Sequence, residues 1–359
     1  MKRRSTPFRL AFTTSALLAF AVSIVGIRPA QGQTPPPATS PATVPPGKKA
    51  ETPPVDFLPP EQLPPAAKYA GPEDPDYVAW AKILLARLGL SDDDLAKNLH
   101  LLRDAVRETL EPSQGDAAAG IIDAALRDLP TMPSASKSLL SGTQPHTELA
   151  RKYLELLLAG DRRAAGELIH GAVRDGIPVH DIYLDVFQRT QHEIGRLWQM
   201  NEISVAEEHY CTAATQLIMS QLYPRIFATP RIGRRLVAAC VGGDLHEIGV
   251  RMVADFFEMA GWDTYYLGAN TPLNGIIDSV EERGADVLAI SATMTYHVSA
   301  VADVIRALRR DGGSRMTRIL VGGYPFRVDP ELWRSIGADG CAADASEAVA
   351  LATRLMGDA

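Results

Sequence analysis

The stretch from Leu236 to Gly249, LVAACVGGDLHEIG, decides the fold of this chain. An apolar run ends at Gly242-Gly243, and the polar turn Asp244-Leu-His-Glu-Ile-Gly249 leads into an amphipathic run, Val250 to Met259. This order predicts a β-strand, a tight glycine turn and an α-helix. In a parallel α/β sheet such a turn lies at the carboxyl end of a strand, where ligands bind.

The spacing of Asp244 and His246 suggests a metal ligand. A carboxylate two residues away can accept the proton of one ring nitrogen, which leaves the other nitrogen bare and more basic. Gly249 has no side chain, so a bulky group could pass between the loop and the sheet. The alternative is an ordinary turn in which Asp244 caps the helix and His246 is solvated. The hexapeptide alone does not separate the two.

Around this turn, the C-terminal part of the chain alternates strands and helices five times. The alternation predicts an α/β domain at 234–359, a flavodoxin-like, doubly wound, five-stranded parallel sheet with right-handed crossovers. We expect strands at 236–241, 264–267, 287–292, 318–321 and 340–343, and helices at 250–260, 273–283, 298–310, 330–336 and 346–356.

Two further signals follow the turn at strand ends. Ser291 lies in the apolar run VLAISAT, with 41 residues between it and Gly249, and Gly322-Gly323 follow the run ILV. The order D-x-H-x-x-G, Ser, Gly-Gly resembles the cobalamin-binding domain of methionine synthase and its relatives. That family usually has S-x-L where this chain has Ser291-Ala-Thr293. The resemblance covers about 152–355.

The resemblance implies cobalamin bound with its benzimidazole tail pulled away from the cobalt. His246 would be the lower axial metal ligand, and Asp244 would hold it. The tail would lie beside the sheet near Ser291 and the two glycines, Gly322 and Gly323, with Thr293 and Gly249 at the same edge. A nicotinamide cofactor fits poorly, because Gly242-Gly243 lacks the G-x-G-x-x-G pattern.

A helical region precedes this domain. Apolar residues recur at intervals of three and four, and Gly160-Asp161 and Gly176-Ile-Pro178 mark turns. We expect a four-helix bundle at 146–228, with helices at 147–159, 162–175, 179–200 and 205–226.

Trp198 is followed, after nine residues, by Glu208-His209. Singly, these residues are typical of a core aromatic and a solvated helix face. Together, and next to a cobalamin signature, they resemble the helical cap of CarH-type adenosylcobalamin photoreceptors. By that resemblance Trp198 would pack on the adenosyl group, and Glu208 and His209 would hydrogen-bond to it. An aromatic face suits a purine, and a carboxylate accepts ribose hydroxyls.

The chain departs from that family at two points. Gln199 stands where its best-known members have the histidine that becomes the second axial ligand after illumination, and an amide is a poor cobalt ligand. A bis-histidine product would then need His209 or His192. The N-terminal DNA-binding domain of that family is also missing here.

The N-terminal region gives a conflicting signal about location. Residues 1–32 combine basic residues at 2–4 with an uncharged, mostly apolar run at 10–27, which predicts a signal peptide or an inner-membrane anchor. Residues 33–76 read as a proline-rich linker, and 132–144 as another. Residues 77–131 predict a small helical region, either an appendage or a docking surface. The cofactor domain instead favours the cytoplasm.

Composition excludes some functions. A net charge of -7 in 359 residues, with no helix-turn-helix pattern, argues against direct nucleic-acid binding. The three cysteines, at 211, 240 and 341, are widely spaced, which predicts reduced thiols rather than a disulfide framework.

These signals together predict a cobalamin-binding sensor rather than an enzyme, with adenosylcobalamin favoured over methylcobalamin. Light would cleave the cobalt–carbon bond and let the cap shift, and the output would pass to a regulatory protein partner. A homo-oligomer is compatible with this scheme. Two alternatives stay open: a corrinoid protein that carries methyl groups for a methyltransferase system, and a passive cobalamin-binding protein.

Overall fold

The computed structural model describes residues 77–310 and 317–357. The expected signal-like segment at 1–32, with its apolar run at 10–27, and the proline-rich segment at 33–76 lie outside the described residues. Among the residues that are described, no helix is long and apolar enough to cross a membrane.

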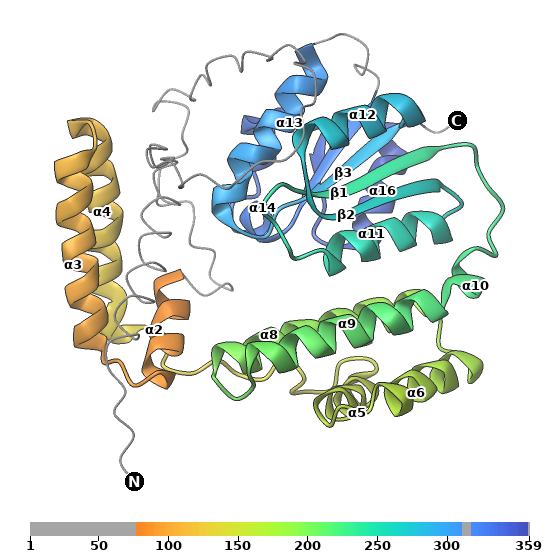
Figure 1. Cartoon of the computed structure of the whole chain (residues 1–359), viewed down its shortest axis with the longest axis horizontal. Coiled ribbons are helices and arrows are strands. Elements are labelled where there is room, and N and C mark those ends of the chain that lie inside the picture. The colour runs from red at the N-terminus through yellow and green to blue at the C-terminus, as the bar shows by residue number, and fades with distance from the viewer. Residues whose placement is uncertain (1–76, 311–316, 358–359) are drawn as a thin grey trace, which may run out of the picture.

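Three helices form the N-terminal part: α2 (Tyr77–Arg87), α3 (Asp92–Thr109) and α4 (Pro112–Asp128). Ser91 and Asp94 start α3 with a capping box, in which each side chain accepts a hydrogen bond from the other residue's backbone N–H. Helices α3 and α4 form a hairpin with its own apolar core (Figure 1). Lys82 of α2 is buried and donates to the carbonyls of Leu129 and Met132, which ties α2 to the end of this hairpin.

The cap follows as a bundle whose elements are α5 (Thr147–Leu158), α6 (Arg162–Arg174), α7 (Val179–Asp181), the π-helical η4 (Ile182–Gln188), α8 (Arg189–Gln199), α9 (Val205–Gln221) and α10 (Tyr223–Ile226). The third expected helix therefore contains a π-helical stretch, which periodicity did not predict. The fourth divides at Leu222, because Pro224 has no N–H with which to continue the helical ladder.

Residues 132–144, directly before the cap, are fixed by hydrogen bonds to α8, although their composition predicts a linker. The amide of Leu139 donates to Glu193 Oε2 of α8 at 2.7 Å, and Arg196 donates to the carbonyl of Ser136. Glu193 and Arg196 themselves form a largely buried ion pair. The segment is thus fixed on the cap by charged groups some sixty residues away in sequence, which serine and proline content does not reveal.

Five strands form one parallel sheet in the order β2-β1-β3-β4-β5, which confirms the doubly wound prediction. They are β1 (Arg235–Val241), β2 (Asp263–Thr271), β3 (Val287–Ser291), β4 (Arg318–Gly322) and β5 (Gly340–Cys341). The register places Cys240 opposite Ser291, and Ser291 opposite Gly322. The carboxyl ends of β1, β3 and β4 therefore lie side by side.

The helices of this domain are α11 (Ile248–Met259), α12 (Leu273–Arg283), η5 (Thr295–His297), α13 (Val298–Arg310), α14 (Tyr324–Val328), α15 (Leu332–Ser335) and α16 (Ala345–Leu355). Helices α11 and α16 cover one face of the sheet, and α12 and α13 cover the other. The helix expected at 330–336 is reduced to α15.

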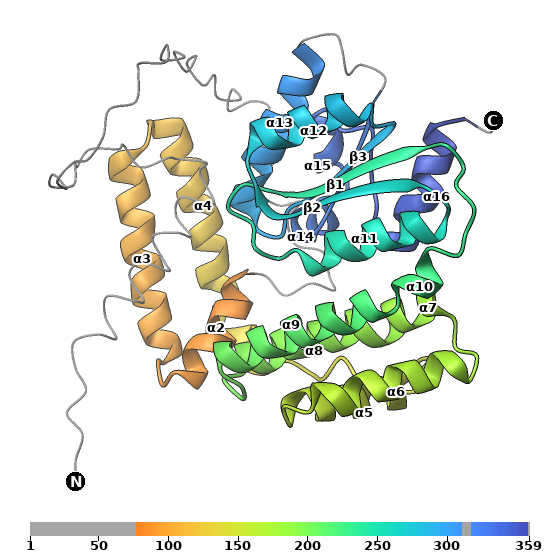
Figure 2. The same cartoon turned by 45° about the vertical axis from the view of Figure 1, so that its right-hand side comes forward.

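Helix α11 joins the sheet to the cap. Its Val250 and Phe257 pack in the core against the sheet, whereas Met252 and Phe256 belong to the core of the cap. In both views α9 runs along α11, and the α3–α4 hairpin stands on the side of the carboxyl ends of the strands (Figures 1 and 2). The cap and the sheet thus meet mainly through α11, with Ala345 and Val349 of α16 also packed on the cap core, and α11 begins directly after the His246 loop.

Candidate functional site

The loop after β1 is pinned to the end of β2. Gly243 has φ +89°, a conformation that favours glycine, and an added Cβ would lie 3.3 Å from His297 Nε2. The amide of Gly243 donates to Asn270 Oδ1 at 2.7 Å, and the amide of Asn270 donates to the carbonyl of Asp244 at 2.8 Å. The backbone that carries Asp244 and His246 is therefore held in place by residues outside the loop.

Asp244 is the buried centre of the site. Its side chain has no exposed surface, and its Oδ1 accepts from the backbone N–H of His246 at 3.0 Å and lies 2.9 Å from His246 Nδ1. Its Oδ2 accepts from the amide of Thr293 at 2.6 Å. The His246 side chain is 62% exposed. When Nδ1–H of His246 donates to Asp244, the Nε2 lone pair of His246 is free to bind a ligand.

The charges of this pair stabilise one another. Burial alone would raise the pKa of Asp244, but hydrogen bonds from His246 and from the amide of Thr293 outweigh burial and lower it to about 2. The hydrogen bond to Asp244 raises the pKa of His246 against the opposing effect of burial, and the negative charge of Glu208 in the cap adds to this rise. Asp244 is therefore ionised at neutral pH, and the cap lies within electrostatic range of the loop.

His297 is a second imidazole at the same carboxylate. The sequence places Tyr296-His297 at a loop start on the rim of the pocket, as structural rather than catalytic residues, and does not predict the contact with Asp244. His297 is 4% exposed, and its Nδ1 lies 3.5 Å from Asp244 Oδ2. Neither ring nitrogen has a hydrogen-bond partner within the described part of the chain. Burial lowers the pKa of His297. The strand order offered a signal, because adjacent β1 and β3 bring their following loops together.

The remaining strand-end residues gather as expected, with differing local roles. Ser291 and Gly322 lie opposite each other at the ends of β3 and β4. Gly323 has φ +105°, and an added Cβ would lie only 2.1 Å from the carbonyl oxygen of Ala292, so a backbone contact requires glycine there. At Gly249 an added Cβ would meet nothing within 4 Å. There is therefore space for a side chain at Gly249, at the start of α11, whereas the close backbone contact at Gly323 leaves no space for one at the sheet edge.

The predicted cap residues are much less constrained. Trp198 is partly buried, and its ring centroid lies 6.1 Å from that of Trp80 in α2. Gln199 is buried and donates to the carbonyl of Trp80 at 3.3 Å. His209 is 75% exposed, and its Nδ1 lies 2.6 Å from Glu208 Oε2 on the adjacent residue. Trp198 thus contacts the N-terminal helical region, for which the sequence predicts either an appendage or a docking surface.

Glu247 is the other residue that sequence reasoning missed. It contacts Gln216 of α9 as well as Tyr266 and Ala269 of β2. Its neighbours in sequence gave no indication of these partners.

The donor set fits a cobalt ion that brings its own macrocycle. In the ranges 77–310 and 317–357, no group of three or more histidine, cysteine or acidic side chains could hold a bare metal ion. One exposed, oriented imidazole instead suits a metal whose equatorial positions are already filled by a corrin ring. All three cysteines are free thiols, as predicted.

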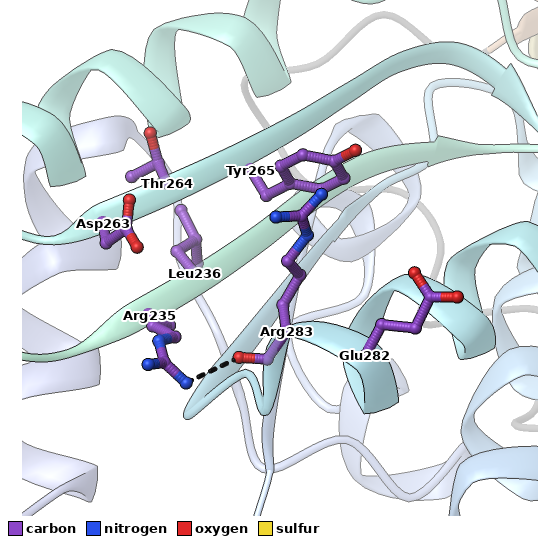
Figure 3. Close-up of a pocket in the computed structure, with 7 residues that line it drawn as sticks. All are labelled: Arg235, Leu236, Asp263, Thr264, Tyr265, Glu282 and Arg283. Carbon is purple, nitrogen blue, oxygen red and sulfur yellow. Dashed lines mark hydrogen bonds between the residues drawn. The ribbon is translucent and has the colours of Figure 1, made fainter.

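One surface pocket lies away from this site. A cavity of about 300 Å³ is formed at the amino ends of β1 and β2, opposite to His246, and Figure 3 shows its lining residues. The guanidinium of Arg283 stacks on the ring of Tyr265, with its carbon 4.0 Å from the centroid. Acidic Asp263 and Glu282 lie beside basic Arg235 and Arg283, so the pocket has no dominant charge, and no residue of the His246 loop lines it.

Comparisons with known proteins agree with this geometry. Residues 234–352 match the B12 binding domain, and 149–223 match a second B12 binding domain family that covers the helical cap. The chain is 31% identical over 168 residues to dimethylamine corrinoid protein 2 of Methanosarcina acetivorans, covering 46% of this chain and 74% of that protein. It is 26% identical over 208 residues to a corrinoid protein of Desulfitobacterium hafniense, covering 56% of this chain and 95% of that protein.

A solved structure shares the fold. The monomethylamine corrinoid protein of Methanosarcina barkeri superposes with a TM-score of 0.52 at 23% identity, covering 59% of this chain and 100% of that one. With a helical cap and B12 binding domains in order, and with the oriented, exposed His246 in the loop after β1, the chain belongs to the family of cobalamin-binding corrinoid proteins.

Proposed function

We propose that this protein is a corrinoid methyl carrier that binds cobalamin between the His246 loop and the helical cap. The observation that carries the proposal is the buried Asp244 carboxylate, 2.9 Å from Nδ1 of an exposed His246, in a region similar to dimethylamine corrinoid proteins. When bound, cobalamin supplies a cobalt centre that can accept a methyl group and release it.

In this proposal the chain's own residues prepare the lower face. His246 binds cobalt through Nε2, and Asp244 fixes the ring orientation and the tautomer. The Thr293 amide holds the second oxygen of Asp244, so the carboxylate cannot rotate away from His246. Ser291 and Thr293, together with Gly249, Gly322 and Gly323, contribute the edge against which the benzimidazole tail lies.

The upper face is proposed to carry a methyl group rather than an adenosyl group. The named relatives are dimethylamine corrinoid proteins, which supports methyl carriage over light sensing and over transcription regulation. By the same similarity, the partner that we propose is a methyltransferase and not a regulatory protein.

The light-responsive adenosylcobalamin sensor is the second candidate. It is favoured by one specific feature, the Trp198, Glu208 and His209 motif in the cap. The two candidates differ in what these side chains should do. A methyl group offers nothing for a carboxylate and an imidazole to hold, whereas an adenosyl group would be bound by all three.

Binding measurements on the purified full chain test the proposal. Dissociation constants for methylcobalamin and adenosylcobalamin are measured in the dark, with visible spectra of the wild type and of His246→Ala. We expect the wild type to bind methylcobalamin at least as tightly as adenosylcobalamin. We expect His246→Ala to lose the spectrum of imidazole-ligated cofactor. If the wild type bound adenosylcobalamin at least tenfold more tightly than methylcobalamin, and Trp198→Ala abolished this preference, the result would contradict the methyl carrier and support the light-responsive sensor. Failure to bind either form would overturn both.

A further inference from the structure

Glu247 connects the His246 loop to two other elements. Its Oε1 accepts from Gln216 Nε2 of α9 at 3.0 Å. Its Oε2 accepts from the hydroxyl of Tyr266 at 2.9 Å and from the amide of Ala269 at 3.1 Å, both on β2. One carboxylate, directly after the candidate cobalt ligand, thus contacts the cap and the sheet at once.

A second polar contact repeats this link one helical turn further along. Arg251, four residues after Glu247 on α11, donates to Ser220 Oγ at 2.6 Å, and Ser220 lies four residues after Gln216 on α9. Residues four apart lie on the same face of a helix. Two hydrogen-bonded pairs, Gln216 with Glu247 and Ser220 with Arg251, therefore lie one helical turn apart along the contact between α9 and α11.

The same face of α9 leads back to the upper side of the site. Glu208 lies eight residues before Gln216, about two turns or roughly 12 Å along the helix. Thr212, midway between them, donates to Glu208 Oε1 at 3.1 Å. A shift of α9 that moves Glu208 must therefore act on the hydrogen bond between Gln216 and Glu247.

This link differs in kind from the rest of the contact between cap and domain. Met252 and Phe256 of α11 are buried in the cap core, so parting them exposes apolar surface. Gln216 and Glu247 are only partly buried, so water can replace their hydrogen bond at small net cost. Ile248, the first residue of α11, packs only partly buried against the cap core, so separating this end of α11 from the cap breaks less apolar contact than parting Met252 and Phe256.

We propose that the hydrogen bond between Gln216 and Glu247 couples the position of the cap helix to the His246 loop, with Glu247 as a positioning residue for the axial ligand. This proposal rests on His246 being the cobalt ligand. When the cap is seated, Gln216 holds Glu247, and Glu247 holds the start of α11 against β2. When the cap moves away, the loop loses one of its restraints and coordination by His246 weakens.

Substitutions at Gln216 separate this role from a merely structural one. Gln216→Met removes the donor to Glu247 and leaves the Tyr266 and Ala269 contacts in place. Gln216→Lys has a similar length, keeps a donor and serves as the rescue variant. Tyr266→Phe removes a β2 contact to the other oxygen and keeps the cap link.

The test uses the full chain loaded with methylcobalamin. Visible spectra give the ratio of imidazole-ligated to unligated cofactor, and amide hydrogen exchange reports on α9. In Gln216→Met we expect the ratio to fall by about twofold to tenfold, the range of one net hydrogen bond, and α9 to exchange faster. Gln216→Lys should restore both readouts. Tyr266→Phe should leave exchange in α9 at the wild-type rate.

The double variant with His246→Ala completes the test. If the coupling exists, Gln216→Met has no further effect on cobalamin affinity once His246 is absent. Equal effects in both backgrounds, or an unchanged ligation ratio in Gln216→Met, would overturn the coupling. If His246→Ala itself leaves the spectrum unchanged, the proposed cobalt ligand fails, and that result is distinct from failure of the coupling.

Discussion

The two faces that a corrin ring would meet are built very differently. On the sheet side, Asp244 has no exposed surface and holds His246 and Thr293 by three hydrogen bonds. On the cap side, His209 is 75% exposed and bonds to its neighbour Glu208. The lower side is fixed before any cofactor arrives, whereas the upper side presents the exposed His209 on a helix that polar contacts help to seat.

This difference suits a carrier. A lower ligand that must bind cobalt in every state benefits from a rigid, oriented imidazole. An upper side that must admit different partners benefits from groups that move aside at little cost. Substitutions on the sheet side should therefore have large effects, and those on the rim of the cap small ones.

The largest effect is expected for Gly323→Ala. The added Cβ would lie 2.1 Å from the Ala292 carbonyl oxygen, at a φ of +105° that side chains rarely adopt. Backbone strain and overpacking together should lower the free energy of unfolding by about 3 kcal/mol or more. Urea unfolding of the cofactor-free chain, followed by circular dichroism, measures the change.

Gly249→Ala is the matched control for this substitution. It lies at the same edge, in α11, and its Cβ would meet nothing within 4 Å. Alanine is also the better helix former, so no loss of stability is expected. Equal destabilisation by the two substitutions would show that the close contact between Gly323 and Ala292 does not require glycine at position 323.

The next largest effect is expected at α11, the helix that joins the cap to the sheet, and concerns the pH dependence of stability. Asp255 of α11 is buried and accepts from the hydroxyl of Tyr183 in the π-helical stretch at 2.8 Å. Burial raises the pKa of Asp255 from 3.8 to about 6. The native state therefore binds this proton more tightly than the unfolded state, so the stability it contributes is full below pH 3.8 and is lost as the pH rises through 6.

Asp255→Asn removes this titration and keeps an acceptor for Tyr183. The free energy of unfolding of the variant, minus that of the wild type, should rise by on the order of 2 to 3 kcal/mol between pH 4 and pH 7. Urea titrations at several pH values measure it, and Asp278→Asn on exposed α12 supplies the control. A difference that does not change with pH would mean that Asp255 is already ionised in the folded protein at pH 4.

Asp244→Asn tests the fixed side through its ligand. An amide offers one acceptor, so its NH₂ group must face either the N–H of Thr293 or the N–H groups of His246. Loss of such an orienting partner should weaken cobalamin binding by about 10- to 100-fold. Titration of methylcobalamin measures the loss, with Asp263→Asn at the opposite end of the sheet as control. If Asp244→Asn bound methylcobalamin with wild-type affinity, the carboxylate of Asp244 would not be needed to orient His246.

The features that could be predicted from the sequence depend on neighbours in the chain. The Asp244–His246 pair follows from a spacing of two residues, and the parallel, doubly wound sheet from five strand–helix alternations. The contacts of His297 and Glu247 depend on loops that meet only in the folded sheet. The contact between Trp80 and Trp198 joins residues more than a hundred positions apart, and a periodic apolar pattern does not specify which helices meet.

The smallest effect is expected on the cap. His209→Ala should change methylcobalamin affinity by less than about twofold, because the side chain is exposed and its bond to Glu208 is weakened by solvent. His180→Ala is a matched control, since His180 is also exposed and lies 3.0 Å from the adjacent Asp181. If His209→Ala instead weakened adenosylcobalamin binding tenfold and left methylcobalamin unaffected, the upper side would be a built adenosyl pocket. The exposed position of His209 would then describe only the cofactor-free protein, and the contrast between the two faces would disappear on binding.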